Sequence, residues 1–260
     1  MLKHSMRLAC LVLAALFAGA AQAEEGDYSA LQTIWNLAFP PGPDNPVRAS
    51  ETTGTYGLKP NPVGYADGWQ PGGYYRWQTI KLAPSTGAVC GNGSQYKFFV
   101  NRVPNTRNTI IYMEGGGACW DYPSCTGASG IRGARNPNGI PDNYMDILAN
   151  PGSSLVSPFI VRLHPYNAVK TQNWNMVYVP YCTGDVYSGD KVAVYNDPSG
   201  QNASLIWHHN GLRNTRAVVA WLRDHLPRST QMLSTGCSAG GIGSLDNYAH
   251  LRRDMAPTRA

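Results

Sequence analysis

Apolar and polar residues form strand patterns in the first half of the chain. Residues 74–82 alternate, residues 95–103 (QYKFFVNRV) give a stronger strand pattern, and residues 108–113 (NTIIYM) form a short apolar run that is typical of a buried strand. Turn-forming residues 104–107 separate the last two runs. The pattern therefore predicts a β-hairpin over residues 95–113.

In the second half, strand and helix patterns follow one another. Residues 175–181 (NMVYVPY) predict a core strand, and residues 205–207 form a short β-type run. Apolar residues then recur at helical spacing over residues 211–226, ahead of Pro227, and a further strand leads into Ser234. We expect an α/β fold built on a doubly wound sheet.

Glycine and proline indicate long loops around this sheet. The chain has 28 Gly and 19 Pro in 260 residues, so we expect long connections within one large domain, residues 73–260. Residues 24–72 predict an N-terminal wrapping segment with little regular structure. Residues 121–165 predict a long loop with a short helix near residues 143–148.

The most informative stretch for function is Gly236-Cys237-Ser238-Ala239-Gly240, a G-x-S-x-G sequence between the last strand and a segment that can form a helix. Strand, sharp turn and helix together are the context of a nucleophile elbow, in which Ser238 would attack a carbonyl. Glycines suit the turn because the backbone crowds both sides of the serine. The start of the helix directs N–H groups, including that of Ala239, at a developing oxyanion. An ordinary Gly-Ser loop is the alternative.

A run of three glycines, Gly115–Gly117, follows the predicted buried strand. In α/β-hydrolases the loop after the third strand supplies the second oxyanion donor, and a glycine run serves this purpose. The bare N–H groups of Gly116 and Gly117 would then face the substrate. The alternatives are a flexible glycine loop and a phosphate cradle, but no G-K-[ST] sequence follows, which argues against a P-loop.

The N-terminus indicates an exported protein. Residues 1–23 predict a secretory signal peptide, with Lys3 and Arg7 before an apolar run and an A-x-A cleavage site at its end. The apolar run is too short for a membrane span, so we expect no stable membrane insertion and a secreted or periplasmic location. Removing this segment lowers the net charge from +5 to +3, which gives no support for nucleic-acid binding.

Five cysteines remain after this cleavage, and an oxidising compartment favours their pairing. Cys119 and Cys125 are close in sequence and could close a small loop, which leaves Cys90 and Cys182 as the natural second pair. Cys237 lies inside the elbow, where a bridge would obstruct the serine, so we expect it to be a free thiol. The sequence contains no C-x-x-C and no H-x-x-x-H, so no metal site is expected.

Three segments resemble the pectin acetylesterases and the related Notum carboxylesterases. Residues 113–120 (MEGGGACW) are similar to the family's LEGGGWC, residues 179–190 (VPYCTGDVYSGD) to its PYCSSDVWSG, and residues 236–241 (GCSAGG) to its elbow. Ala118 stands where the family often has an aromatic residue, which alters the expected shape of the substrate cleft. The resemblance implies an α/β-hydrolase type of fold, an O-acylated substrate such as an acetylated polysaccharide, and no cofactor.

Triad partners for Ser238 are absent from the end of this sequence. This fold supplies its triad in the order Ser, Asp, His. The segment after the serine contains Asp246, Asp254 and His250, and Asp246 lies roughly 12 Å along a helix that leads away from the serine. We therefore expect the acid and the base beyond Ala260. The sheet is then incomplete, with one edge of the elbow strand unpaired.

Polar residues upstream of the elbow are expected to serve the fold. Asp185 and Asp190 lie in a predicted surface loop, residues 183–190, whose backbone they would fix. The histidines upstream of the serine are a fallback for the base; they are His164, His208, His209 and His225. We expect His208 and His209 to pack at the start of the predicted helix instead.

The sequence thus predicts a secreted carboxylic-ester hydrolase with Ser238 as nucleophile and the N–H groups of Gly116, Gly117 and Ala239 as oxyanion hole. Two alternatives stay open. One is a truncated chain without turnover, because the Asp and His are missing. The other is a lipase or polyester depolymerase on the same fold; an apolar lid would favour a lipase, and we find no lid sequence.

Overall fold

The computed structural model describes five stretches of the chain, namely residues 69–129, 133–146, 158–160, 162 and 169–260. The predicted signal peptide and nearly all of the predicted wrapping segment lie outside these described residues. Of the predicted short helix, residues 143–146 are described, and residues 143–145 form a turn rather than a helix.

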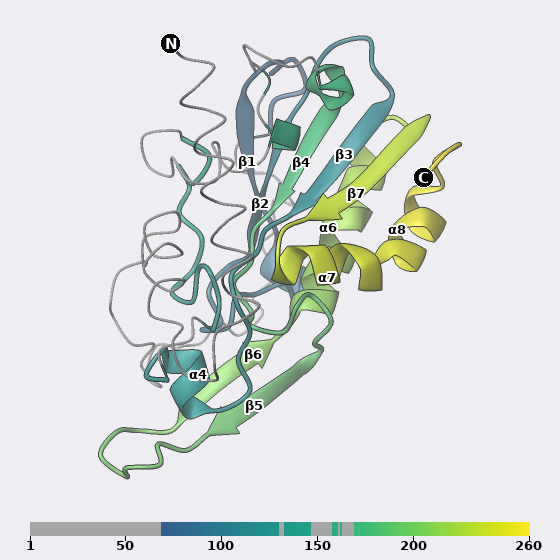
Figure 1. Cartoon of the computed structure of the whole chain (residues 1–260). Coiled ribbons are helices and arrows are strands. Elements are labelled where there is room, and N and C mark those ends of the chain that lie inside the picture. Colours follow the sequence, from purple (N-terminus) through teal and green to yellow (C-terminus); the bar gives the residue numbers. More distant parts are fainter. Residues whose placement is uncertain (1–68, 130–132, 147–157, 161, 163–168) are drawn as a thin grey trace, which may run out of the picture. The chain divides into compact units, whose positions relative to one another are not determined.

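A five-stranded mixed sheet forms the centre of the described chain, in the order β1-β2-β4-β3-β7 (Figure 1). Its strands are β1 (Trp77–Lys81), β2 (Lys97–Asn101), β3 (Asn108–Met113), β4 (Asn175–Val179) and β7 (Gln231–Gly236). Strands β4, β3 and β7 run parallel, whereas β2 pairs antiparallel with β1 and with β4. The fold is therefore α/β, as predicted.

The predicted hairpin between β2 and β3 is wrong. Strand β2 pairs with β1 and β4, and β3 lies between β4 and β7, its two parallel partners. The reason is burial: residues 109–113 of β3 are all buried, so this strand requires a neighbour on both sides. Turn-forming residues such as 104–107 indicate only that the chain changes direction. They do not indicate which distant strands pair with β3.

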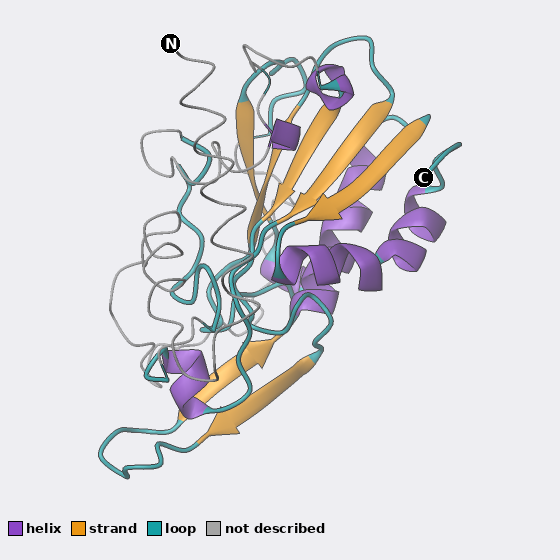
Figure 2. Cartoon of the chain, in the orientation of Figure 1, coloured by secondary structure: helices purple, strands orange, loops and turns teal. Residues whose placement is uncertain are grey.

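The described part of the second half contains three α-helices (Figure 2). They are α6 (Gly211–His225), α7 (Ala239–Asp246) and α8 (Tyr248–Met255), and α6 matches the predicted helix closely. No helix within the described stretches has the length and apolar character that crossing a membrane requires.

A separate two-stranded sheet pairs β5 (Lys191–Tyr195) antiparallel with β6 (Leu205–His209). Among its described residues, the long predicted loop has one short α-helix that the sequence did not reveal, α4 (Tyr122–Thr126). Asp121 caps this helix by accepting a hydrogen bond from the Ser124 N–H at 2.9 Å. Short 3-10 turns are formed by Pro84–Thr86, Pro158–Ile160 and Lys170–Asn173.

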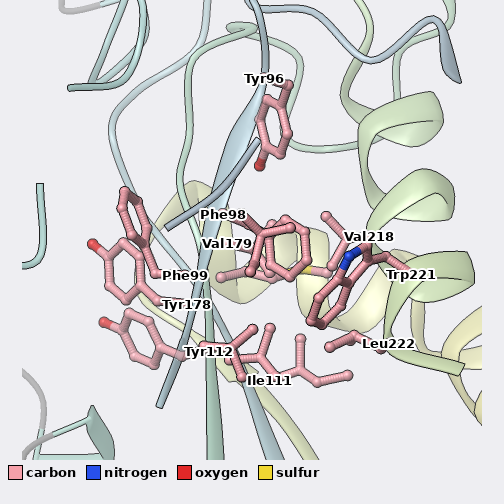
Figure 3. Close-up of a cluster of buried hydrophobic side chains, with 14 of the residues drawn as sticks. Tyr96, Phe98, Phe99, Ile111, Tyr112, Tyr178, Val179, Val218, Trp221 and Leu222 are labelled. Carbon is pink, nitrogen blue, oxygen red and sulfur yellow. The ribbon is translucent and has the colours of Figure 1, made fainter. Parts of the chain in front are cut away.

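Side chains from the two faces of the sheet form the core (Figure 3). One face packs on α6, where the rings of Phe98 and Trp221 lie 5.3 Å apart between centroids. The opposite face carries aromatic rings: Tyr112 stacks on Tyr178 at 5.6 Å, and Tyr144 covers Phe99 at 6.0 Å. Because each such side chain contributes about 1.5–3 kcal/mol on burial, this packing is the main source of stability.

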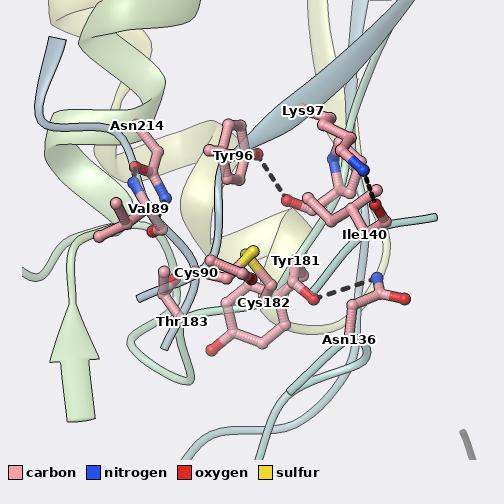
Figure 4. Close-up of a disulfide and its surroundings, with 12 residues drawn as sticks. Val89, Cys90, Tyr96, Lys97, Asn136, Ile140, Tyr181, Cys182, Thr183 and Asn214 are labelled. Atoms are coloured by element: carbon pink, nitrogen blue, oxygen red, sulfur yellow. Dashed lines mark hydrogen bonds between the residues drawn. A yellow bond between two sulfur atoms is a disulfide. The ribbon is translucent and has the colours of Figure 1, made fainter. Parts of the chain in front are cut away.

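Two disulfides connect the loops at the carboxyl end of the sheet. Cys90 pairs with Cys182 (Figure 4), Cys119 pairs with Cys125, and Cys237 is a free, half-buried thiol, in agreement with the sequence. Beside the first bridge, the Gly91 N–H donates to the Cys182 carbonyl at 2.8 Å, so covalent and hydrogen bonds hold the same two loops together.

Removing these bridges should have unequal effects. The Cys90–Cys182 pair spans 92 residues and the Cys119–Cys125 pair only 6. Because a longer closed loop restricts the unfolded chain more, we expect the double alanine variant of Cys90 and Cys182 to lose about 4–5 kcal/mol of unfolding free energy, and that of Cys119 and Cys125 about 2 kcal/mol. Urea unfolding of the two double variants measures this difference. Equal losses would contradict it.

Candidate active site

Ser238 occupies a sharp, strained turn between β7 and α7. Its backbone angles are φ 53° and ψ −123°, which a residue with a side chain rarely adopts. Such a conformation costs on the order of 1–3 kcal/mol, so the surrounding structure must impose it. The serine is exposed, and it directly precedes the first residue of α7, Ala239. This is the geometry of the predicted nucleophile elbow.

The glycines on either side of the serine are required by close backbone contacts. A Cβ on Gly236 would lie 2.4 Å from the Gly240 carbonyl, and a Cβ on Gly240 would lie 2.0 Å from the carbonyl oxygen of Met113, at the end of β3. No side chain fits at these distances. The elbow is therefore held directly against the end of the neighbouring strand.

The glycine run after β3 lies beside the serine. A Cβ on Gly115 would be 2.4 Å from the Cys237 carbonyl oxygen and 3.1 Å from the Ser238 Cβ. Gly116 packs instead against the backbone of Arg135, and Gly117 has a positive φ of 94°. The sequence pointed to Gly116 and Gly117 and missed Gly115, the member of the run whose contacts reach the elbow.

Backbone donors are available on both sides of the serine. Within the described chain, the N–H groups of Gly116, Gly117 and Ala239 donate to no protein acceptor. Ala239 begins α7, so its N–H belongs to the unpaired first turn of that helix. An oxyanion formed at Ser238 would find these donors without first breaking existing hydrogen bonds.

Glu114 is a functional candidate that the sequence did not reveal. It lies between β3 and the glycine run, and it is buried. Its Oε1 accepts hydrogen bonds from the hydroxyls of Tyr144 and Tyr178, the latter at 2.7 Å. Its Oε2 accepts from the Tyr181 N–H at 3.0 Å and from the Asn136 Nδ2 at 3.1 Å. Four donors thus fix the residue from which the loop departs.

The charge of this carboxylate is partly balanced. Burial raises the pKa of Glu114, while Arg135 and the hydrogen-bond donors lower it. The Arg135 Nε lies 3.7 Å from Glu114 Oε1, and both side chains are 8% exposed. A buried acid beside a buried arginine orders the loop because each group requires a partner of opposite charge.

Asp185 fixes the backbone, as the sequence suggested, whereas Asp190 pairs with a side chain. The Asp185 carboxylate accepts hydrogen bonds from the Gly211 N–H at 2.6 Å, at the start of α6, and from the Thr183 hydroxyl at 2.7 Å. Asp190 forms an ion pair with Arg213 at 2.7 Å. The segment is less superficial than predicted, because Thr183 is buried and Asp185 is half-buried.

His209 makes its hydrogen bonds with the surrounding fold. His209, in β6, has one ring nitrogen 2.8 Å from the Tyr195 hydroxyl and the other 3.1 Å from the Thr183 carbonyl. Burial lowers the pKa of His208 and that of His209. Among the described residues, no histidine or carboxylate hydrogen-bonds to the Ser238 hydroxyl, and His164 lies outside them.

One group of side chains in the described stretches has the spacing of a metal site, namely Cys119, Cys125 and His209. The two cysteines are joined in a disulfide, so their sulfur atoms are not available as thiolate ligands. The two nitrogens of His209 are also engaged. This group stabilises the fold around α4 and β6.

The open edge of β7 is shorter than the sequence suggested. Arg259 pairs in parallel with Gln231, and the Met232 N–H donates to the Arg259 carbonyl at 2.9 Å. Arg259 in turn donates to the Thr230 carbonyl at 2.9 Å. The first residues of the elbow strand therefore have a partner on the side opposite β3, which corrects the predicted unpaired edge there.

Comparison with known proteins identifies the family. The sequence model of the Pectinacetylesterase family matches residues 71–259. The chain belongs to the pectinacetylesterase family. This match covers both the glycine run and the elbow, so the two halves of the site described above belong to the family's own region.

Curated relatives of this pectinacetylesterase-family chain come from animals and plants. It is 28% identical over 172 residues to the palmitoleoyl-protein carboxylesterase NOTUM of Drosophila melanogaster, covering 65% of this chain and 23% of the relative. It is 29% identical over 170 residues to pectin acetylesterase 7 of Arabidopsis thaliana, covering 64% and 38%. The chain thus spans well under half the length of these relatives.

A solved structure of the Wnt deacylase Notum from Drosophila is also similar. It aligns with a TM-score of 0.46 at 24% identity, covering 68% of this chain and 46% of that chain.

Proposed function

We propose that this pectinacetylesterase-family chain carries the nucleophile and the oxyanion hole of a secreted carboxylic-ester hydrolase. The observation that supports it most strongly is the strained, exposed Ser238 beside the glycine run. A backbone strained at one serine, between glycines that allow no side chain, is characteristic of a site where the serine must be presented to a substrate.

The reaction follows from these positions. The Ser238 Oγ attacks the ester carbonyl carbon and loses its proton to solvent, and the carbonyl oxygen becomes an oxyanion held by N–H groups of the Gly115–Gly117 loop and of Ala239. Collapse of this intermediate breaks the bond to the alcohol oxygen, which takes up a proton as it leaves. Water then attacks the acyl-serine and releases the carboxylic acid. The chemistry requires no cofactor or metal.

The proposed substrate is an O-acetylated polysaccharide or a similar O-acyl ester. The names of two relatives support an ester: one is a pectin acetylesterase and the other a palmitoleoyl-protein carboxylesterase. Export is part of the proposal, and two disulfides are consistent with an oxidising compartment. We further propose that this chain alone turns over slowly, because the described residues bring no general base to Ser238.

Acylation of Ser238 tests the role of this residue directly. Because 4-nitrophenolate is a good leaving group, 4-nitrophenyl acetate should acetylate Ser238 slowly even without a base, and the acyl group should accumulate because no base activates water for its release. We expect peptide mapping by mass spectrometry to find one acetyl group on the peptide that contains Ser238. The same peptide from a Ser238→Ala variant should carry none, and thermal unfolding should show that the variant is folded.

Ser234→Ala is the matched control. Ser234 lies in β7, the strand that leads to Ser238, and its Oγ lies 3.5 Å from the Ser244 carbonyl. This variant should be acetylated at Ser238 as fast as the wild type. Acetylation spread over surface lysines, with none at Ser238, would refute the proposed nucleophile.

A further inference from the structure

Tyr187 makes hydrogen bonds at the ends of two parallel strands. It is 1% exposed, and its hydroxyl lies 2.8 Å from the Glu114 carbonyl oxygen and 2.9 Å from the Val179 carbonyl oxygen. The Glu114 carbonyl belongs to the peptide unit that continues into Gly115. A hydrogen bond to this oxygen therefore orients the first peptide of the glycine run, the Gly115 N–H included.

The same tyrosine supports the helix that follows the elbow. A Cβ on Gly243, in α7, would lie 2.4 Å from the Tyr187 ring, so ring and helix are in direct contact. The Asn247 Nδ2, at the end of α7, donates to the Tyr187 carbonyl at 3.1 Å. Tyr187 thus contacts the helix through its ring and its backbone, and the glycine run through its hydroxyl.

Both halves of the site meet at one carbonyl group. A Cβ on Gly240, in the first turn of α7, would lie 2.7 Å from the Glu114 oxygen that accepts the Tyr187 hydroxyl. A shift of this carbonyl would therefore move the glycine run and the first turn of α7 against each other. These are the two segments that would hold the oxyanion.

The backbone at Tyr187 is strained. Val186 and Tyr187 are consecutive non-glycine residues with positive φ, at 50° and 67°. The Val186 N–H donates to the Tyr181 hydroxyl at 2.8 Å, and the Tyr187 N–H donates to Asp185 Oδ1 at 3.1 Å. The rings of Tyr181 and Tyr187 lie 5.0 Å apart. Strain of this kind persists where the surrounding contacts require one conformation.

We propose that Tyr187 is a positioning residue that sets the separation between the Gly115–Gly117 loop and the first turn of α7, and thereby the fit of the oxyanion between them. This inference rests on the esterase function proposed above. It assigns a role to the segment of residues 179–190, which that function leaves unexplained.

The test compares Tyr187→Phe with Tyr96→Phe. Tyr96 is an equally buried tyrosine whose hydroxyl donates to a backbone carbonyl, that of Pro180, at 2.6 Å. The rate of Ser238 acetylation is measured over a range of 4-nitrophenyl acetate concentrations. We expect Tyr187→Phe to lower the maximal rate constant about tenfold to a hundredfold, with the half-saturating concentration changed less than about twofold. Tyr96→Phe should change neither, although both variants lose a buried hydrogen bond and some thermal stability.

Amide hydrogen exchange supplies a readout that is independent of acetylation. In Tyr187→Phe, exchange should rise about tenfold in the peptides that contain residues 114–118 and 237–243 together, and in Tyr96→Phe it should rise in neither. Equal losses of acetylation in the two variants, or an unchanged rate in Tyr187→Phe, would overturn the inference.

Acetylation of the wild type at Ser238 separates this inference from the proposed function. If the wild type is not acetylated at Ser238, the esterase proposal fails, and exchange alone decides whether Tyr187 links the loop to the helix. A rise confined to one of the two peptides would then disprove the link.

Discussion

The 260-residue chain is expected to hydrolyse 4-nitrophenyl acetate with a kcat at least about a thousandfold below that of full-length Arabidopsis pectin acetylesterase 7. A serine hydroxyl must lose its proton as it attacks, and the described residues place no histidine or carboxylate against Ser238. The oxyanion donors remain, and donors alone retain roughly a thousandfold to ten-thousandfold of rate over water, far less than a complete triad. Steady-state kinetics of the two proteins under the same conditions measure the difference.

The pH dependence strengthens this experiment. A catalytic histidine would give a rise of kcat/KM with an apparent pKa near neutrality, whereas a site that works through backbone donors has no such group. We therefore expect the slow rate to lack a rise between pH 6 and 8 beyond that of the uncatalysed reaction. Turnover comparable to the relative would contradict the prediction and show that a base reaches Ser238 from outside the described residues. His164 is then the first residue to replace.

The second large effect is expected at Glu114. Glu114→Ala removes the acceptor shared by two tyrosine hydroxyls, one backbone N–H and one amide, all of them buried. Because buried donors that lose their acceptor are costly, we expect the variant to lose about 3–5 kcal/mol of unfolding free energy. Urea unfolding measures this as a lower midpoint at an unchanged slope.

Two further variants make the result specific. Asp190→Ala breaks the ion pair between Asp190 and Arg213, whose side chains are 47% and 50% exposed, respectively. Because exposed ion pairs contribute little, the variant should lose less than about 1 kcal/mol of unfolding free energy. Glu114→Gln keeps one acceptor oxygen but turns an amide NH2 toward two donors, so its stability should lie between those of the wild type and Glu114→Ala. If Glu114→Ala were no more harmful than Asp190→Ala, the network around the carboxylate would contribute little to the fold.

The elements that the sequence predicted well are those whose signals are local. Strand β3 and helix α6 coincide with their patterns because apolar spacing reports burial over a few residues. Strand β5 was missed because its hydrophobicity is inverted: Val192 and Val194 are exposed and Ala193 is buried. The order of the strands was not predictable in this way, because pairing depends on residues far apart in the chain.

The residues of the candidate site show the same difference between local and distant signals. The strained turn at Ser238 was predictable because its glycine pattern lies within five residues, 236–240. Glu114 and Tyr187 were missed because their partners are distant: Glu114 binds the Tyr181 N–H across 67 residues, and Tyr187 binds the Glu114 carbonyl across 73. For Glu114 the sequence did contain a signal, because a charged residue directly after an apolar strand is expected to be buried and to require buried partners.

The place of β3 in the sheet has a consequence for synthesis of the chain. Its partner β7 begins about 120 residues further on, so β3 leaves the ribosome long before its second neighbour exists. At roughly 5–20 residues per second, the interval lasts roughly 6–24 s. During that time the apolar strand Asn108–Met113 has an open edge, which is prone to pairing with other chains. Molecular chaperones that bind nascent apolar segments would therefore be needed most between the synthesis of the glycine run and that of the elbow.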